Sequence, residues 1–70
     1  MYIAYNNEHE IWGWGSTASD ASAMALELSE ENDDNFFAIV AATPELVDRA
    51  QWFFVNGNSW CIQNGIAVLN

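Results

Sequence analysis

Residues 36–57, FFAIVAATPELVDRAQWFFVNG, determine the fold class, because they place a strand signal directly before a helix signal. The run 36–42 is apolar and of strand length, which is typical of a buried central strand. Thr43 is a good N-cap, Pro44 suits the first helical position, and Gly57 can end the helix in the left-handed conformation. The expected core stripe of this helix consists of Leu46, Ala50, Phe53 and Phe54.

Two strands are expected before this segment. Residues 1–7 (MYIAYNN) and 9–15 (HEIWGWG) are typical of strands that pair around a polar turn at residues 6–8. Gly13 and Gly15 indicate a β-bulge or a close approach by a neighbouring element. Alternation along the second strand puts three residues on one face, opposite Ile11. These three residues are Glu10, Trp12 and Trp14.

The segment 16–31, STASDASAMALELSEE, has the period of a helix. Thr17 is a good N-cap, with Asp20 in the position of a capping-box acid. At about 100° per residue, the apolar side of this helix gathers Ala18, Ala21, Ala25 and Leu28. The opposite side gathers Asp20, Glu27, Glu30 and Glu31. A core face made mostly of alanine allows the helix to lie close to a sheet.

The C-terminal segment predicts a hairpin. Asn64-Gly65 is a preferred pair for a type I′ turn, so residues 60–63 should pair with residues 66–69. The whole chain, 1–70, is therefore expected to be one α+β domain of order ββαβαββ. We expect a mostly antiparallel sheet of four to five strands with two helices on one face. The other face of the sheet would be exposed unless a partner or a second copy covers it.

The charge balance excludes several classes of function. The chain has ten Asp or Glu residues and one Lys or Arg, which gives a net charge of −9. A field of one sign repels nucleic acid and membranes and steers the chain toward cationic surfaces. We therefore expect a basic protein partner and no direct binding to nucleic acid or membranes. The sequence has no signal-peptide pattern and no apolar run of about 18 residues, so we expect a cytoplasmic protein.

The sequence predicts no enzyme, metal site or cofactor. His9 and Cys61 are the only histidine and cysteine, and they fall in different hairpins, which argues against a Cys–His nucleophilic pair. They are also too few for a structural zinc site. The stretch 31–35, ENDDN, lacks the length and glycine of an EF-hand calcium loop. No glycine-rich phosphate loop is present either.

The stretch ELSEENDDN, residues 27–35, is the most unusual feature of the sequence. Acids at the C-terminal end of a helix each cost a few tenths of a kcal/mol, and no basic residue stands beside these acids to offset that cost. A solvated helix face is the ordinary interpretation of such a run. The alternative is a partner-binding acidic patch. Its candidate residues are Asp20, Glu27, Glu30, Glu31, Asp33 and Asp34, extended by Glu8 and Glu10.

In its small size, its acidity and its lack of a catalytic set, the chain resembles the small phage-encoded anti-CRISPR proteins, notably the acidic ones that act as DNA mimics. The resemblance lies in these general properties, covers the whole chain and includes no diagnostic motif. It implies a stoichiometric inhibitor in the bacterial host cell that blocks target-DNA or PAM binding by a basic subunit of a CRISPR–Cas effector. The acidic patch would then pair with Lys and Arg side chains that normally hold phosphates.

Two other functions remain open on the sequence. The chain could be an acidic adaptor or assembly module that binds its partner through apolar contacts, with Trp52 as a candidate aromatic anchor. It could also be a DNA-mimic inhibitor of a restriction or repair enzyme. Binding through apolar area would depend little on salt, whereas mimicry would weaken as salt rises. Trp12 and Trp14 are expected to lie under the helices, and the chain to be a monomer or a homodimer.

Overall fold

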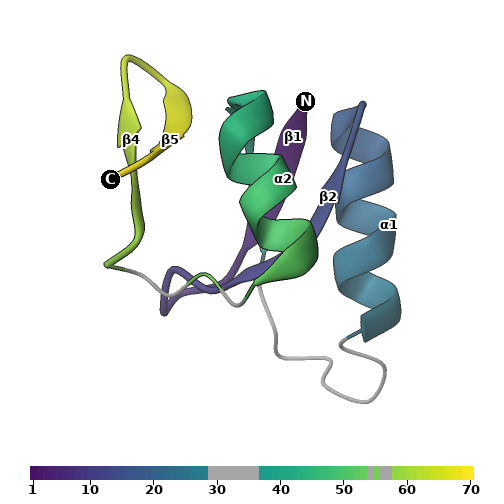
Figure 1. Cartoon of the computed structure of the whole chain (residues 1–70). Helices are drawn as coiled ribbons and strands as arrows, with labels where there is room; N and C mark the ends of the chain where they lie inside the picture. Colours follow the sequence, from purple (N-terminus) through teal and green to yellow (C-terminus); the bar gives the residue numbers. More distant parts are fainter. Residues whose placement is uncertain (29–36, 54, 56–57) are drawn as a thin grey trace.

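The computed structural model describes residues 1–28, 37–53, 55 and 58–70. The elements follow the order ββαβαββ, so the predicted α+β class is confirmed (Figure 1). The elements are β1 (Tyr2–Tyr5), β2 (Ile11–Gly15), α1 (Ala18–Leu28), β3 (Ala38–Ala42), α2 (Pro44–Trp52), β4 (Trp60–Gln63) and β5 (Ile66–Leu69).

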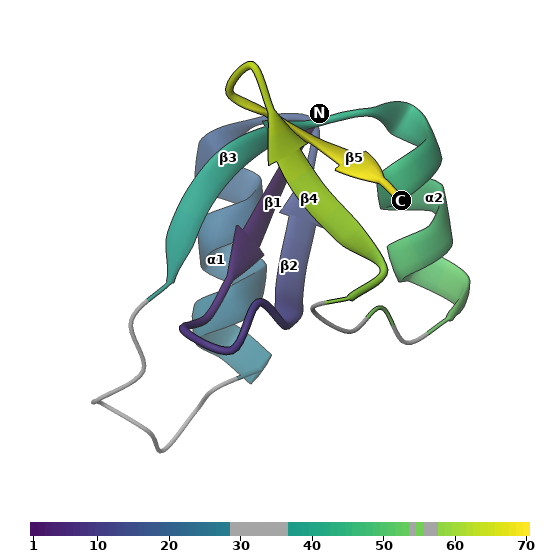
Figure 2. The same ribbon diagram turned by 90° about the vertical axis from the view of Figure 1, so that its left-hand side faces the viewer.

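The strands form one five-stranded sheet in the order β2-β1-β3-β5-β4. Only the β3–β5 pair is parallel, and the other pairs are antiparallel. The helix α2 leads from β3 to the edge strand β4, and β5 then returns between β3 and β4. The predicted, mostly antiparallel sheet of four to five strands is thus confirmed with five strands, and β3 is its central strand. In Figure 2 the β4–β5 hairpin lies in front of β1 and β2, so the sheet curls around an enclosed side.

The two helices cover opposite faces of the sheet, so the prediction that both lie on one face is wrong. In β1, Ile3 is buried with Leu46 and Val47 of α2, whereas Ala4 is buried with two alanines of α1. Consecutive residues of a strand point to opposite faces. Figure 1 shows α2 and the β4–β5 hairpin on one side of β1 and β2, with α1 on the other side. Because both faces of β1 are apolar, its sequence does not show that a helix covers each face.

We call the sheet face toward α2 the inner face and the face toward α1 the outer face. The inner face carries the larger core. Its buried residues are Ile3, Ala42, Leu46, Val47, Val55, Trp60 and Ala67. The outer face carries a smaller core of Ala4, Ala21 and Ala25.

A β-bulge in β2 separates the two tryptophans of this strand. The register between β1 and β2 shifts between Ala4 and Tyr5, which leaves Trp12 as an extra residue. Trp12 packs beside Phe37 at the outer core, with ring centroids 5.8 Å apart, and Trp14 packs against the inner core. The bulge falls at Trp12 and not at Gly13 or Gly15, where the sequence suggested one, and because of it the predicted shared face of Trp12 and Trp14 is wrong.

Gly13 allows α1 to approach β2 closely, which confirms the predicted close packing at the glycines. A Cβ at Gly13 would clash with the carbonyl oxygen of Ala21 and would lie 2.8 Å from the backbone nitrogen of Ala25. Both Ala21 and Ala25 are fully buried, as predicted for the core face of this helix, whereas Ala18 and Leu28 are exposed. The contact between α1 and the sheet is therefore built from very small side chains.

Both helices begin where the sequence predicts. The hydroxyl of Thr17 accepts a hydrogen bond from the backbone N–H of Asp20 at 3.1 Å, and Thr43 accepts one from Leu46 at 3.3 Å. The carboxylate of Asp20 accepts from the hydroxyl of Ser16 at 3.5 Å. Each cap satisfies a backbone donor that the first helical turn leaves unpaired.

The predicted end of α2 is wrong. The helix stops at Trp52, and Phe53 is its extended C-cap. The predicted left-handed conformation of Gly57 lies outside the described residues. Leu46 is buried and Ala50 packs against the inner core, but Phe53 is 62% exposed and does not belong to the core stripe. The predicted core role of Phe54 lies outside the described residues.

Candidate functional site

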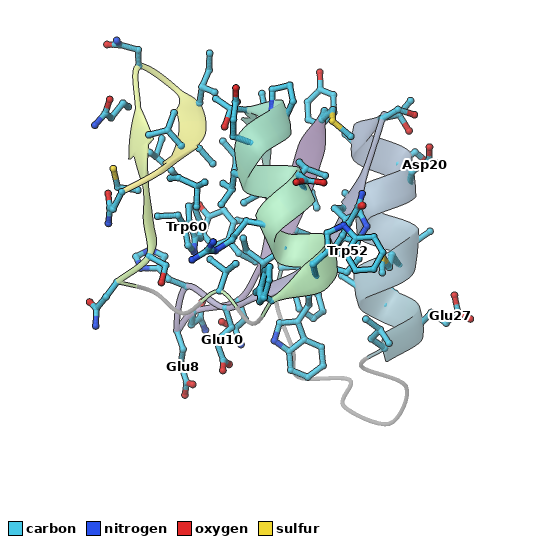
Figure 3. The ribbon with its side chains drawn as sticks, viewed as in Figure 1. Glu8, Glu10, Asp20, Glu27, Trp52 and Trp60 are labelled. Atoms are coloured by element: carbon cyan, nitrogen blue, oxygen red, sulfur yellow. The ribbon has the colours of Figure 1, made fainter. Side chains whose placement is uncertain are left out.

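The two acids of α1 that the structure describes, Asp20 and Glu27, lie on its exposed side. They are separated by seven residues, which is close to two helical turns or about 10 Å along the axis. Figure 3 shows both side chains directed away from the sheet. The other acids predicted for this stripe lie outside the described residues. These are Glu30, Glu31, Asp33 and Asp34.

Glu8 and Glu10 lie in the turn between β1 and β2, which Asn6 organises. The side-chain oxygen of Asn6 accepts hydrogen bonds from the backbone N–H groups of both glutamates, each at 2.9 Å. The side-chain amide of Asn6 donates to the Glu10 carboxylate at 2.8 Å. His9 completes the turn in the left-handed region, with φ of 60°. The Glu10 carboxylate thus helps to hold the turn, whereas Glu8 is free to face solvent.

The described acids do not form one continuous surface. Figure 3 places Glu8 and Glu10 together, at a distance from Asp20 and Glu27 on the outer side of α1. The sequence alone does not show this separation, because it depends on α1 packing against the outer face of the sheet. A further exposed pair, at positions 45 and 48 of α2, is absent from the predicted patch.

The single basic side chain does not neutralise these carboxylates. The guanidinium of Arg49 lies over the ring of Phe53, 5.1 Å from its centroid, in a cation–π contact. In the part of the chain that the structure describes, no carboxylate forms an ion pair. Each described acid therefore keeps its charge available to a partner.

An aromatic surface lies at the C-terminal end of α2. Trp52 is 74% exposed and Phe53 is 62% exposed. Figure 3 shows Trp52 at this end of the helix. The two rings border a hollow of about 300 Å³, whose lining residues are Ile11, Ala50, Gln51, Trp52, Phe53 and Val55. The early end of α2 explains why sequence reasoning missed Phe53: beyond Trp52 the helical period no longer applies.

His9 and Cys61 point to different sides of the sheet. The ring of His9 packs edge-on against Trp60, with centroids 5.7 Å apart, and Trp60 is part of the inner core. Cys61 follows Trp60 in β4, so its side chain points to the outer face, where the side-chain amide of Gln63 donates to its sulfur at 3.7 Å. Among the residues that the structure describes, no group of three His, Cys, Asp or Glu could hold a metal ion.

No protein-family model matches this chain, and comparison with curated proteins and with solved structures gives no match. Within the described ranges, no helix is long and apolar enough to cross a membrane. The most distinctive feature of this chain is its net charge of −9, and the carboxylates that the structure describes form no ion pair.

Proposed function

We propose that this chain is a stoichiometric protein inhibitor that acts as a DNA mimic on a basic nucleic-acid-binding protein. The observation that carries the proposal is the net charge of −9 on a chain whose one arginine is engaged with an aromatic ring. The resemblance to acidic anti-CRISPR proteins favours a subunit of a CRISPR–Cas effector in a bacterial host as the target. The inhibitor would occupy the surface with which that subunit binds target DNA or reads the PAM.

The spacing of the carboxylates on α1 supports this mechanism. Asp20 and Glu27 are about 10 Å apart along the helix axis, which is close to three base-pair steps of about 3.4 Å. Lys and Arg side chains that hold phosphates on such a spacing can form charge-assisted hydrogen bonds with carboxylates instead. The one-sign field also speeds the encounter with a basic surface.

Charge reversal on α1 tests the proposal. The partner is first captured from a bacterial lysate on the immobilised chain at low salt, and its association is then measured by surface plasmon resonance. We expect the double variant Asp20→Lys/Glu27→Lys to associate about tenfold more slowly or worse, because a steered encounter depends on local charge. We expect the captured protein to bind nucleic acid and to be released as salt rises.

The matched control is the double variant Glu45→Lys/Asp48→Lys, which changes the net charge by the same amount on exposed positions of α2. A smaller effect from this control assigns binding to the α1 surface and not to net charge alone. Equal association of the α1 variant and the parent would refute mimicry through α1.

The exposed aromatic pair favours a second candidate function, an adaptor that binds a protein through apolar contacts. Trp is enriched among residues that dominate interfaces, where its truncation costs about 2 kcal/mol or more, which is roughly 30-fold in affinity. Under the proposed mimicry we expect Trp52→Ala to weaken binding of the captured protein by less than about threefold. A loss of about 30-fold that persists in high salt would instead establish the adaptor.

A further inference from the structure

Among the residues that the structure describes, nothing pairs with the free side of the edge strand β4, and this edge lacks the usual protection. This strand ends the strand order of the sheet, and Figure 1 shows no other element beyond it. Proteins normally protect such edges with charged residues, proline or a bulge. The sequence of β4, WCIQ, contains no proline or charge, and its register with β5 has no shift. In fact no residue from Ala50 to Asn70 has a charged side chain.

The register of the hairpin defines which backbone groups face this edge. Asn64 and Gly65, with φ of 54° and 80°, form the turn, so Gln63 and Ile66 are a hydrogen-bonded pair. Such pairs alternate along an antiparallel ladder. The Asn70 N–H donates to the Ser59 carbonyl at 2.9 Å, in agreement with this alternation. The N–H and C=O groups of Trp60 and Ile62 therefore point away from β5.

We propose that two copies of this chain dimerise by antiparallel pairing of their β4 strands around a two-fold axis at Cys61. In this register the backbone of Trp60 in each copy exchanges hydrogen bonds with the backbone of Ile62 in the other copy. Every N–H and C=O group of these two residues that points away from β5 then has a partner. The same patch serves both copies, as a two-fold interface requires. Pairing joins the two sheets into one and covers part of Ile62, which is 44% exposed.

The distribution of charge favours a second copy of this chain, and not a basic partner, as the molecule that pairs with this edge. A basic strand would find no carboxylate side chain between residues 50 and 70, whereas a neutral hairpin meets an identical neutral hairpin without local repulsion. The acids of the β1–β2 turn lie close to this hairpin, because the carbonyl of His9 accepts a 3.0 Å hydrogen bond from the indole of Trp60. Repulsion between Glu8 and Glu10 of the two copies should therefore weaken the dimer at low salt.

Salt then separates this inference from the proposed function. We expect the dimer fraction in sedimentation velocity to rise between about 0.1 M and about 1 M salt, where the Debye length falls from about 10 Å to about 3 Å. Binding of a basic protein to carboxylates changes in the opposite direction. A purely monomeric chain at high salt and high concentration would overturn the dimer and leave the inhibitor proposal standing.

Variants of Ile62 test the edge directly. Ile62→Pro removes an N–H that β5 does not use, a position at which an edge strand tolerates proline. We expect it to abolish the dimer, whereas Ile62→Val, which keeps both the N–H and the β-branched shape, retains it. Comparable thermal unfolding of the two variants shows that the proline leaves the fold intact. If Ile62→Pro unfolds the chain, Ile62→Lys replaces it, and a dimer that survives either folded variant overturns the proposal.

Cys61 reports the register independently. In the proposed dimer its two copies face each other as a non-hydrogen-bonded pair, with Cα atoms about 4.5 Å apart, which suits a disulfide. Diamide should then link the copies: two thiols lose two protons and two electrons, diamide takes them up as the hydrazine, and one S–S bond forms. The control Cys61→Ser/Gln63→Cys moves the thiol along the same face of β4 to a position about 13 Å from its counterpart. Equal cross-linking of parent and control would overturn the register.

Discussion

Trp60→Ala is expected to leave little folded protein at room temperature. Trp60 is 4% exposed and belongs to the inner core, where its ring packs edge-on against Tyr5 at 5.1 Å between centroids. Truncation of such a side chain costs about 3–5 kcal/mol. A chain of 70 residues has a total unfolding free energy on the order of 5 kcal/mol. Urea unfolding followed by circular dichroism measures the loss.

A graded variant and a matched control complete this test. Trp60→Phe keeps an aromatic ring but removes the indole donor to the His9 carbonyl, so we expect a smaller loss of about 1–3 kcal/mol. Trp52→Ala removes the same side chain from a position that is 74% exposed and should change stability by less than about 0.5 kcal/mol. Similar losses at positions 60 and 52 would contradict the placement of the inner core.

Gly13→Ala is the second substitution with a large expected effect. The added methyl group would meet backbone atoms of Ala21 and Ala25, which cannot rotate away as a flexible side chain could. The helix must shift to accommodate it, and such overpacking costs about 1–3 kcal/mol. For a chain of this size we expect a drop in melting temperature of roughly 4–8 °C per kcal/mol, measured by calorimetry.

Gly65→Ala provides the control for the glycine prediction. Its φ of 80° strains any other residue, but a Cβ at this position would meet no atom within 4 Å. The expected cost is therefore only the conformational preference, about 1 kcal/mol. If Gly13→Ala were as mild as Gly65→Ala, then α1 would not lie as close to β2 as the structure places it.

Local signals predicted those parts of the fold that depend on neighbouring residues. Asn64-Gly65 fixed the last hairpin and its register, and Thr17 and Thr43 marked the starts of both helices. In each case a few adjacent residues determine the backbone, through left-handed φ values or a capping hydroxyl. Such features do not depend on tertiary contacts with the rest of the chain.

Features that depend on contacts between elements far apart in the sequence were not predictable. The β-bulge at Trp12 shifts the alternation of β2, and no local pattern identifies which residue is extra. The helices lie on opposite faces because β1 offers Ile3 to one helix and the small Ala4 to the other. The early stop of α2 was likewise not predicted, because the helical spacing of apolar residues in the sequence continues past Trp52, whereas Phe53 is extended.

The candidate site was predictable only as a helix face. The period of α1 put Asp20 and Glu27 on one side, where the structure also places them. Sequence reasoning grouped Glu8 and Glu10 with them because all four are acidic. Their separation in space depends on the path of β1 and β2, and the role of Glu10 in the turn depends on Asn6, which no charge pattern indicates.

The contact of α1 with the sheet has a consequence for the motion of this helix. Its only fully buried residues are two alanines, so detachment of α1 exposes far less apolar surface than global unfolding does. Local opening should therefore require less free energy, and amide hydrogens of α1 should exchange with deuterium faster than those of β1 and β3. Because Asp20 and Glu27 move with this helix, a partner that grips them would slow the exchange. The slowing of amide exchange in α1 on binding would then measure how strongly partner binding stabilises this helix against local opening.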